Sequence, residues 1–395
     1  MTARPKFKVL QVIDTLGMGG AETWLMEVLR LWSKTGMGQL DFLLTSGHRG
    51  IFDTEASDLG AKLHYLRFGR STVQRFTRGF RQILATGDYN AIHDHGDTAS
   101  GWHLLMGAGV LPPVRVVHVH NPTLHMNVNY AVSPSRKFVV SMGRSLINLL
   151  ATDICGTSEE ILRSYGYRPR QVGRPKVSVL HCGIDVDHFN GEPERDRESV
   201  LQEFGWMPEI KLVLFVGRLD RALEYPHPKN HKNSWFALNV MRTAIAMDPS
   251  LRFIMAGDAD HVSVELDRWI GSWGLRDKLR IAGIRKDVPR LMHAADALLF
   301  PSVQEGLGMV AVEAQAAGLP VLASTAVPLE AIVVPELYEA LSLDQSLDSW
   351  AQHLIRLLAK PRLSRQLCQS VFERSPFSIA NSARNLEAVY RGASR

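Results

Sequence analysis

Apolar positions fall in short runs rich in Val, Ile and Leu, and these runs alternate with longer segments of helical period. Such alternation is typical of βα units around a parallel sheet. In the first half of the chain it predicts helices near residues 21–32 and 136–150, and strands at 9–13, 40–44, 62–66, 91–93, 115–119 and 177–180. We therefore expect a doubly wound α/β domain in this half.

The same pattern begins again at residue 212. It predicts helices near 235–247, 264–273 and 309–317, and strands at 212–216, 252–256, 279–282, 297–300 and 321–323. Beyond Pro361 the pattern is helical, without a further strand. A second doubly wound domain is expected, because a chain of 395 residues is too long for one ordinary core.

Residues 191–199, of sequence GEPERDRES, are polar and charged and include Pro193, a composition typical of an interdomain linker. We therefore expect an N-terminal domain at residues 1–190 and a C-terminal domain at 191–375. The last segment, 376–395, is expected to be a helix that packs back on the N-terminal domain. Two Rossmann-like domains of this kind would face each other across a cleft.

Composition narrows the class of protein. Hydrophobic residues make up 45% of the chain and charged residues 22%, which is typical of a folded protein. The longest apolar stretch, 138–155, is interrupted by Arg144 and Asn148 and falls short of the roughly 20 residues that a membrane span needs. The run at 9–13 is too short for a signal peptide, so we expect a cytoplasmic protein. Three widely spaced cysteines offer neither a disulfide framework nor a zinc motif.

The charge favours anionic partners. A net charge of +5 is too small and too dispersed for a nucleic-acid groove, and phosphate-bearing ligands explain it more simply. Two segments are rich in Lys and Arg, one at residues 67–81 with interleaved Phe68, Phe76 and Phe80, the other at 136–144. Each is either the solvated face of a helix or a patch that docks on anionic lipid headgroups at the inner face of the cell membrane.

Residues 300–318, FPSVQEGLGMVAVEAQAAG, predict a strand end, a glycine turn and a helix that begins near Met309. Backbone N–H groups of Gly308, Met309 and Val310 would then point outward at the positive end of the helix dipole, where a diphosphate fits. Glu313 would reach a ribose diol, and Glu305 would lie near a sugar. The alternative is a surface loop with two solvated glutamates.

A second source of positive charge follows the strand at 212–216. Arg218 ends the run VGR, and Lys229 stands in the run KNHK. Arg218 and Lys229 could neutralise a diphosphate, because open α/β sheets bind ligands at the carboxyl ends of their strands. Basic residues near turns are otherwise ordinary surface residues.

The first domain also has a strand followed by a glycine turn, with Gly19 and Gly20 before Glu22. Glu22 stands where a dinucleotide fingerprint has its third glycine, so an NAD site is disfavoured. The glycines still allow close approach of a ligand to the backbone.

Histidines gather at two strand ends, in the runs HDHGD at 93–97 and HVHN at 118–121. They could bind a metal or hydrogen-bond a substrate, and we favour the second because no further ligand has a recognisable spacing. His120 is the candidate site residue, whereas His118 suits the core. Two Asp-x-Asp strings, at 185–187 and 258–260, serve equally well as helix caps, and no metal is assigned to them.

Taken together, these residues resemble glycosyltransferase family four, which has the GT-B fold. The resemblance extends over nearly the whole chain and rests on GGAE at 19–22, HVHN at 118–121, CGIDVDHF at 182–189, VGRL at 216–219, KNH at 229–231, AGD at 256–258, DVPRLMHAADALLFPS at 287–302 and EGLGMVAVEAQAAGLPV at 305–321. The sequences of the runs HVHN and EAQAAGLPV most resemble those of bacterial exopolysaccharide and capsule-type members.

The resemblance implies a retaining transferase that moves a sugar from a nucleotide diphosphate sugar, such as a UDP-sugar, to a saccharide or lipid-linked acceptor, without a cofactor or metal. The catalytic candidates are then Glu305, Arg218, Lys229 and His120, and the donor-binding candidates are Gly19, Gly20, Glu313, Gly308, Met309, Val310, Ile284 and Arg285.

Two departures from the family pattern affect this interpretation. Cys182 replaces the usual Asn before Gly-Ile-Asp, and the spacer at residues 220–228 is longer than usual, so Lys232 or Arg221 could replace Lys229. Two other functions stay open. The chain could hydrolyse or epimerise a nucleotide sugar, or it could be a silent scaffold that only binds one.

Overall fold

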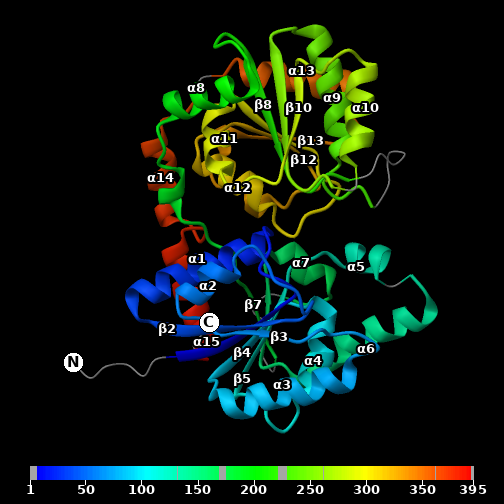
Figure 1. Cartoon of the computed structure of the whole chain (residues 1–395), viewed down its shortest axis with the longest axis vertical. Coiled ribbons are helices and arrows are strands. Elements are labelled where there is room, and N and C mark those ends of the chain that lie inside the picture. The colour runs from blue at the N-terminus through cyan, green and yellow to red at the C-terminus, as the bar shows by residue number, and fades with distance from the viewer. Residues whose placement is uncertain are drawn as a thin grey trace. The chain divides into compact units, whose positions relative to one another are not determined.

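The computed structural model describes residues 7–130, 132–168, 175–220, 229–260, 262–360 and 362–392. The chain forms two compact units, Met1–Ile184 together with Pro376–Arg395, and Asp185–Ser375 (Figure 1). The boundary thus follows Ile184, before the expected position at 190/191. The expected linker at 191–199 is wrong, because Pro193–Phe204 forms helix α8, with proline in its first turn and Glu194 and Asp196 beside its positive end.

The first unit is a sheet of seven parallel strands covered by helices. Its strands are β1 (Phe7–Ile13), β2 (Gly38–Leu44), β3 (Leu63–Tyr65), β4 (Ala91–Asp94), β5 (Val114–Val119), β6 (Asp153–Gly156) and β7 (Lys176–Val179). Its helices are α1 (Gly20–Thr35), α2 (Asp53–Asp58), α3 (Val73–Gly87), α4 (Ser100–Met106), α5 (Thr123–Asn129), α6 (Pro134–Leu150), α7 (Glu159–Ser164) and α15 (Ile379–Tyr390). The strand order is β3-β2-β1-β4-β5-β6-β7, so the order reverses between β1 and β4.

The second unit repeats this design with six parallel strands. They are β8 (Lys211–Val216), β9 (Leu251–Ala256), β10 (Leu279–Gly283), β11 (Ala297–Phe300), β12 (Val321–Ser324) and β13 (Tyr338–Leu341), in the order β10-β9-β8-β11-β12-β13. Besides α8, the helices are α9 (Ser234–Met247), α10 (Ser263–Ser272), α11 (Val288–Ala294), α12 (Met309–Ala316), α13 (Leu347–Leu358) and α14 (Arg365–Arg374). Here the order reverses between β8 and β11.

The predicted fold class, two doubly wound α/β domains, is confirmed. Every predicted strand is present within a few residues of its expected bounds, but β6 and β13 were missed. Each has only four residues, and β6 includes Asp153 and Gly156, which weaken the apolar signal. β13 lies at the sheet edge and is only half buried, so little in its sequence marks it as a strand.

The C-terminal helix α15 belongs to the core of the first unit. Two backbone hydrogen bonds of 2.8 Å join Ile184 to the chain that leads into α15. The N–H of Ile184 donates to the carbonyl of Phe377, and the N–H of Ile379 donates to the carbonyl of Ile184. Leu386 is fully buried. The Trp24 indole of α1 donates to the hydroxyl of Ser382 across 2.8 Å. The sheet and α15 therefore share one buried interior.

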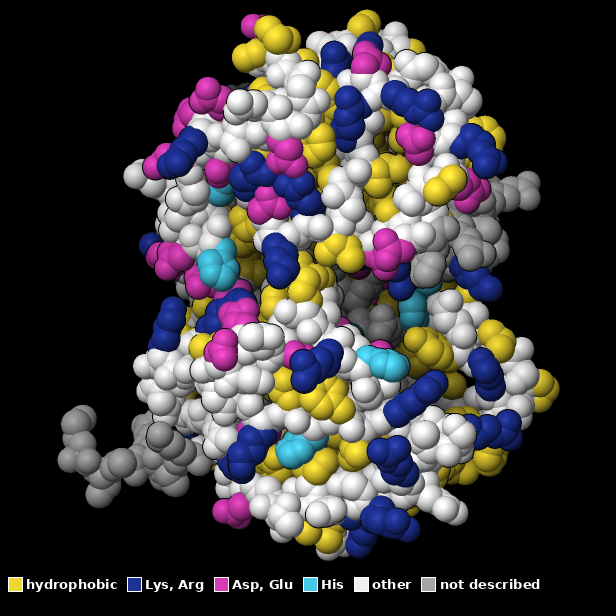
Figure 2. All heavy atoms as spheres, in the orientation of Figure 1, with side chains coloured by type: hydrophobic (Ala, Val, Ile, Leu, Met, Phe, Trp, Pro, Cys, Tyr) yellow, Lys and Arg dark blue, Asp and Glu magenta, His cyan; other side chains and the backbone are white. Residues whose placement is uncertain are grey.

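The two basic segments, on α3 and α6, differ in how far the large apolar side chains between their basic residues are exposed. Phe76 and Phe80 of α3 are buried against the sheet, so the phenylalanines of that helix do not face solvent. On α6, Phe138 is 62% exposed and Leu149 is 76% exposed, beside exposed Arg136 and Lys137. Figure 2 shows such hydrophobic side chains beside Lys and Arg on the first unit. Among the described residues, no helix is long and apolar enough to cross a membrane.

Candidate functional site

In the second unit, candidate residues gather at the carboxyl ends of β8 and β11, the neighbours between which strand order reverses. The loops there approach closely. A Cβ atom on Gly257, after β9, would lie 2.0 Å from the carbonyl oxygen of Gly217, after β8. Both glycines have positive φ, 149° and 153°. Glycine is therefore required at residue 257, and the turn leads directly into the exposed Arg218.

Asp220 fixes the next part of this loop. Its buried carboxylate accepts hydrogen bonds from the backbone N–H groups of Lys232 and Asn233, at 2.8 and 2.9 Å. Its backbone N–H donates to the hydroxyl of Ser234, which begins α9, across 2.8 Å. Burial raises the pKa of Asp220 although these N–H groups lower it. The carboxylate therefore holds residue 232 next to the end of β8.

Lys232 points to the loop after β11. Its Nζ lies 2.6 Å from Oε1 of Glu305, and both side chains are largely buried, with exposed fractions of 26% and 10%. The same Nζ lies 5.3 Å from the ring centre of Phe300, the last residue of β11. A charge-assisted contact of this kind holds a cation and a carboxylate at one place on the sheet edge.

The helix N-terminus predicted from the sequence is present. Gly308 is the N-cap of α12 with φ of 90°, and a Cβ atom there would lie 2.9 Å from Cγ1 of Val327. The first N–H groups of a helix have no partner within it, so those of Met309 and Val310 are available to an anion by geometry. Glu313 lies on α12, partly exposed.

The other residues proposed for the donor site in this unit are Lys229, Ile284 and Arg285. Lys229 is exposed, and Ile284 is 55% exposed. Arg285 forms ion pairs with Asp287 and Glu203, at 2.8 and 2.5 Å, in a network that also contains Arg290. These contacts hold the Arg285 side chain toward α8. Arg221 lies outside the described residues.

In the first unit, the glycine turn and its glutamate fit tightly together. A Cβ atom on Gly19, the N-cap of α1, would lie 2.2 Å from Oε2 of Glu22, so a larger residue there would displace this carboxylate. Burial raises the pKa of Glu22. Gly20 is the first residue of α1.

Asp97 shapes the loop after β5. It adopts φ of 50°, which is uncommon for a non-glycine residue. Its carboxylate accepts from the backbone N–H of His120 at 2.8 Å, and from the side chain of Asn121 at 2.7 Å. Burial is the main reason that the pKa of Asp97 is raised to about 6. His120 is thereby fixed at the end of β5, partly exposed, whereas His118 is fully buried as expected.

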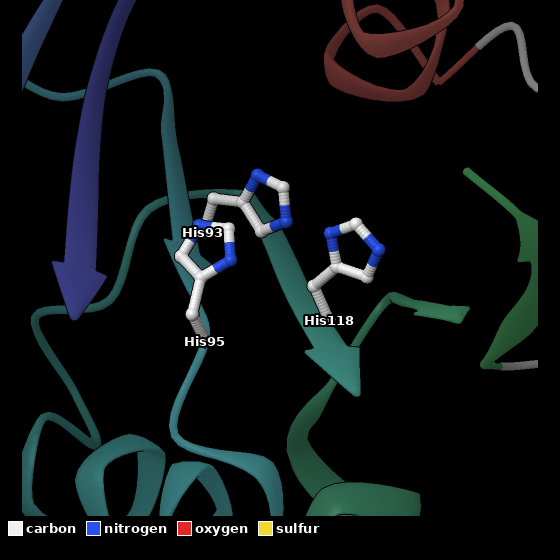
Figure 3. Close-up of side chains that lie close together, drawn as sticks. All are labelled: His93, His95 and His118. Atoms are coloured by element: carbon white, nitrogen blue, oxygen red, sulfur yellow. The ribbon is translucent and has the colours of Figure 1, made fainter. Parts of the chain in front are cut away.

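Three imidazoles, those of His93, His95 and His118, lie close together behind this loop (Figure 3). One nitrogen from each ring lies within 4.8 Å of one nitrogen of each other ring, so the structure supplies the third histidine that the sequence pattern lacked. However, both nitrogens of His95 already have partners, His120 at 2.9 Å and Gln11 at 2.9 Å. His93 and His95 therefore belong to a hydrogen-bonded group, and the His118 ring packs against their rings.

The two Asp-x-Asp strings form turns. Asp185 accepts from the N–H of Asp187 at 3.1 Å, and Asp258 accepts from the N–H of Asp260 at 3.1 Å. Each first aspartate thus has the local capping contact that was the alternative to metal binding.

Sequence reasoning missed several residues of these sites. It did not find Asp220 or the contact between Lys232 and Glu305, which joins residues 73 positions apart. It also passed over Gln11, although a polar side chain in the middle of an apolar strand was a usable signal.

The chain is similar to known glycosyltransferases. Residues 210–360 match the family of glycosyl transferases group 1. A Bacillus subtilis protein, EpsF, described as a glycosyltransferase, is 28% identical over 389 residues, 97% of this chain and 96% of its own. The D-inositol 3-phosphate glycosyltransferase of Mycobacterium marinum is 30% identical over 229 residues, 55% of this chain and 45% of its own.

The solved structures agree on the fold. HepE of Anabaena, in complex with UDP, superposes with a TM-score of 0.73 at 18% identity, over 98% of this chain and 100% of that one. This likeness confirms the expected GT-B fold. The resemblance to glycosyltransferases drawn from the sequence motifs is also confirmed.

The histidine cluster predicts acid sensitivity of the first unit. Burial lowers the pKa of His93, His95 and His118 well below the ordinary value and that of His120 to about 4. Unfolded histidines titrate near 6.5, so between the two values the unfolded chain binds more protons and stability falls as the pH falls. Each such histidine adds up to about 1.4 kcal/mol per pH unit. Asp97 and Glu22, whose pKa values are raised, oppose this trend.

We expect the hydrogen-exchange protection of β4 and β5, corrected for intrinsic exchange rates, to fall between pH 7 and pH 5. Strands β9 and β11 of the second unit serve as the internal control. His93→Phe should make the fall less steep. Equal protection of β4 and β5 across this range would contradict the assignment of neutral histidines.

Proposed function

We propose that this chain, similar to glycosyltransferases along its length and matched to group 1 over residues 210–360, transfers a sugar from a UDP-sugar to an acceptor hydroxyl with retention of configuration. The observation that carries the proposal is the grouping of Arg218, Lys232, Glu305 and the α12 N-terminus at the reversal of strand order in the second unit. HepE is described in complex with UDP-glucose, which supports a UDP-sugar donor.

The positive groups of this edge fit a diphosphate. Arg218 offers a planar fork of donors, Lys232 a compact charge, and Met309 and Val310 backbone N–H groups at the positive end of α12. Such fixed charge stabilises the negative charge that develops on a departing diphosphate. No side-chain nucleophile is needed, since the acceptor hydroxyl attacks from the face that the diphosphate leaves.

We place the second cation at Lys232 in preference to Lys229. Its ammonium is held at the sheet edge by Glu305, while its backbone is held by Asp220. When a donor binds, its phosphate would become a second partner of the Lys232 ammonium. The Glu305 carboxylate would then turn toward hydroxyls of the donor sugar, and Glu313 toward the ribose.

The acceptor would bind in the first unit, near Gly19 and His120, and we propose a lipid-linked saccharide. The exposed apolar and basic residues of α6 support contact with an anionic membrane. A groove of about 450 Å³ beside them is lined by Asn127, Lys137, Val140, Ser141, Arg144, Ser145 and Asn148. We propose a role in bacterial polysaccharide synthesis, which the resemblance of the runs HVHN and EAQAAGLPV to exopolysaccharide-type members supports.

Nucleotide-sugar hydrolysis or epimerisation and silent binding remain the alternatives to transfer. Consumption of the nucleotide sugar that does not depend on an acceptor would favour the first. Binding of a nucleotide sugar without its consumption would favour the second, and failure to bind any nucleotide diphosphate would favour a catalytically silent interaction module.

Removing the cations should abolish transfer while the fold persists, because both lie on loops. We expect Arg218→Ala and Lys232→Met each to lower kcat by about 100- to 1000-fold, the usual cost of losing a preorganised donor to developing charge. Glu305→Ala should also abolish transfer, and Glu313→Gln should chiefly weaken donor binding. Steady-state kinetics with a UDP-sugar measure these effects.

Lys229→Met is the matched control for Lys232→Met, because it removes the same charge from the same loop. It should retain most of the activity. If Lys229→Met were the inactive variant and Lys232→Met the active one, the second cation would have to be moved to Lys229.

Transfer should need no divalent metal. The positive groups already present would neutralise the diphosphate, and the carboxylates nearby, Glu305 and Glu313, are assigned to sugar and ribose hydroxyls, whereas a metal would need several oxygen ligands beside the phosphates. We expect full activity in excess EDTA. Activity that is lost in EDTA and restored by Mg²⁺ or Mn²⁺ would show that a cation carries the leaving-group charge.

Membrane contact should depend on α6. Exchange of Arg136 and Lys137 for glutamate should weaken co-sedimentation with anionic vesicles at low salt, because the exposed basic residues flank exposed apolar ones. Exchange of Arg75 and Arg78 on α3 for glutamate makes the same change in charge. Because the phenylalanines of α3 are buried, this exchange should weaken vesicle binding less. Equal binding of the unaltered protein to anionic and neutral vesicles would exclude the lipid contact.

A further inference from the structure

A chain of hydrogen bonds runs through the first unit from His120 to the C-terminal helix. Nε2 of His120 lies 2.9 Å from Nδ1 of His95, and Nε2 of His95 lies 2.9 Å from Oε1 of Gln11. The Gln11 amide donates to the hydroxyl of Tyr390 across 2.8 Å, and that hydroxyl lies 2.7 Å from Nδ1 of His93.

Every member except His120 is buried. Gln11 and His93 have no exposed surface, Tyr390 is 1% exposed and His95 is 8% exposed. His120 is partly exposed at the end of β5, so it is the end of the chain that a ligand can reach. The other end is His93 on β4, which the chain reaches through Tyr390 on α15.

The protons along this chain are strictly coupled. The histidines are neutral, since burial lowers their pKa values, and a neutral imidazole has one N–H and one acceptor nitrogen. Each hydrogen bond of the chain contains one hydrogen, which belongs to one of its two partners. The hydrogens can therefore be arranged in two ways along the chain. The direction in which the Tyr390 hydroxyl donates determines which nitrogen of His120 carries its hydrogen.

The orientation of the Gln11 amide selects one arrangement. Its oxygen accepts from Nε2–H of His95, which leaves Nδ1 of His95 to accept from Nε2–H of His120. Its nitrogen donates to Tyr390, whose own hydrogen then points to Nδ1 of His93. In this arrangement Nδ1 of His120 has no hydrogen and is an acceptor.

We infer that Gln11 and Tyr390 are positioning residues that fix the tautomer of His120 through His95, so that Nδ1 of His120 accepts a hydrogen bond from a hydroxyl of the sugar ligand. The identity of the ligand rests on the proposed function, whereas the coupling to Tyr390 does not. The C-terminal helix thus takes part in ligand recognition without touching the ligand.

The coupling can be measured without any ligand. NMR spectra of the histidine ring nitrogens distinguish the two tautomers, and His120→Ala identifies the His120 signals. We expect the unaltered protein to show His120 as the Nε2–H tautomer. In Tyr390→Phe the Gln11 amide loses its acceptor and can reverse, so His120 should become a mixture of both tautomers.

Tyr89→Phe is the matched control. It also removes a buried hydroxyl from the first unit, where the Tyr89 hydroxyl donates to Asp41 across 2.9 Å, and it lies outside the chain. It should leave the His120 signals unchanged. If Tyr390→Phe does not fold, Gln11→Met interrupts the same chain with a side chain of similar length and should give the same mixture.

Activity provides the second measurement. Tyr390→Phe should lower kcat/KM in proportion to the fraction of His120 that has left the Nε2–H tautomer, about twofold for an even mixture. In the background of His120→Ala the same substitution should cause no further loss, because its effect passes through His120.

Two spectral outcomes would overturn the inference. One is a His120 tautomer that is the same in Tyr390→Phe, Gln11→Met and the unaltered protein. The other is an unaltered protein in which Nδ1 of His120 carries the hydrogen. Additive losses in Tyr390→Phe and His120→Ala would also overturn it. A protein without transferase activity that still shows the tautomer shift would instead refute the proposed function alone.

Discussion

The reversal of strand order at the centre of each sheet is the constraint on which both sites depend. Loops that follow β1 and β4, or β8 and β11, leave the sheet toward opposite faces, so the backbone and side chains at the carboxyl ends of these strands border a common space. Polar groups there have no strand partner to satisfy them. In both units a carboxylate satisfies backbone N–H groups there, that of Asp97 in the first and that of Asp220 in the second.

The two units satisfy this constraint with different chemistry. In the second unit the edge is charged, and the contact of Lys232 with Glu305 keeps a cation and an anion in place before any ligand arrives. A pair of this kind limits the rearrangement needed when a diphosphate binds, because its charges are already oriented. The cost of burying the pair is limited because Lys232 remains 26% exposed.

Much of this could be predicted from the sequence, for physical reasons. Runs of β-branched residues identify buried parallel strands, and glycines identify turns such as that of Gly308. The choice between Lys229 and Lys232 could not be made, because it depends on where the Asp220 carboxylate holds the loop. The phenylalanines of α3 were ambiguous, since a stripe at helical spacing suits a core and a membrane equally. The hydrogen bond between Gln11 and Tyr390 could not be predicted, because the two residues are 379 positions apart in the sequence.

In the first unit the edge is neutral, and that difference matters for what it can bind. Burial keeps His93, His95 and His118 uncharged, so they attract a diphosphate no more than a hydroxyl, and the hydrogen bonds of His95 have fixed directions. A sugar hydroxyl is itself both donor and acceptor, and a histidine of fixed tautomer distinguishes its orientation where a charged one could only donate. A charged edge in one unit and a neutral, directional edge in the other match the proposed transfer, in which the bond from the sugar to the diphosphate breaks and a bond from the sugar to the acceptor hydroxyl forms.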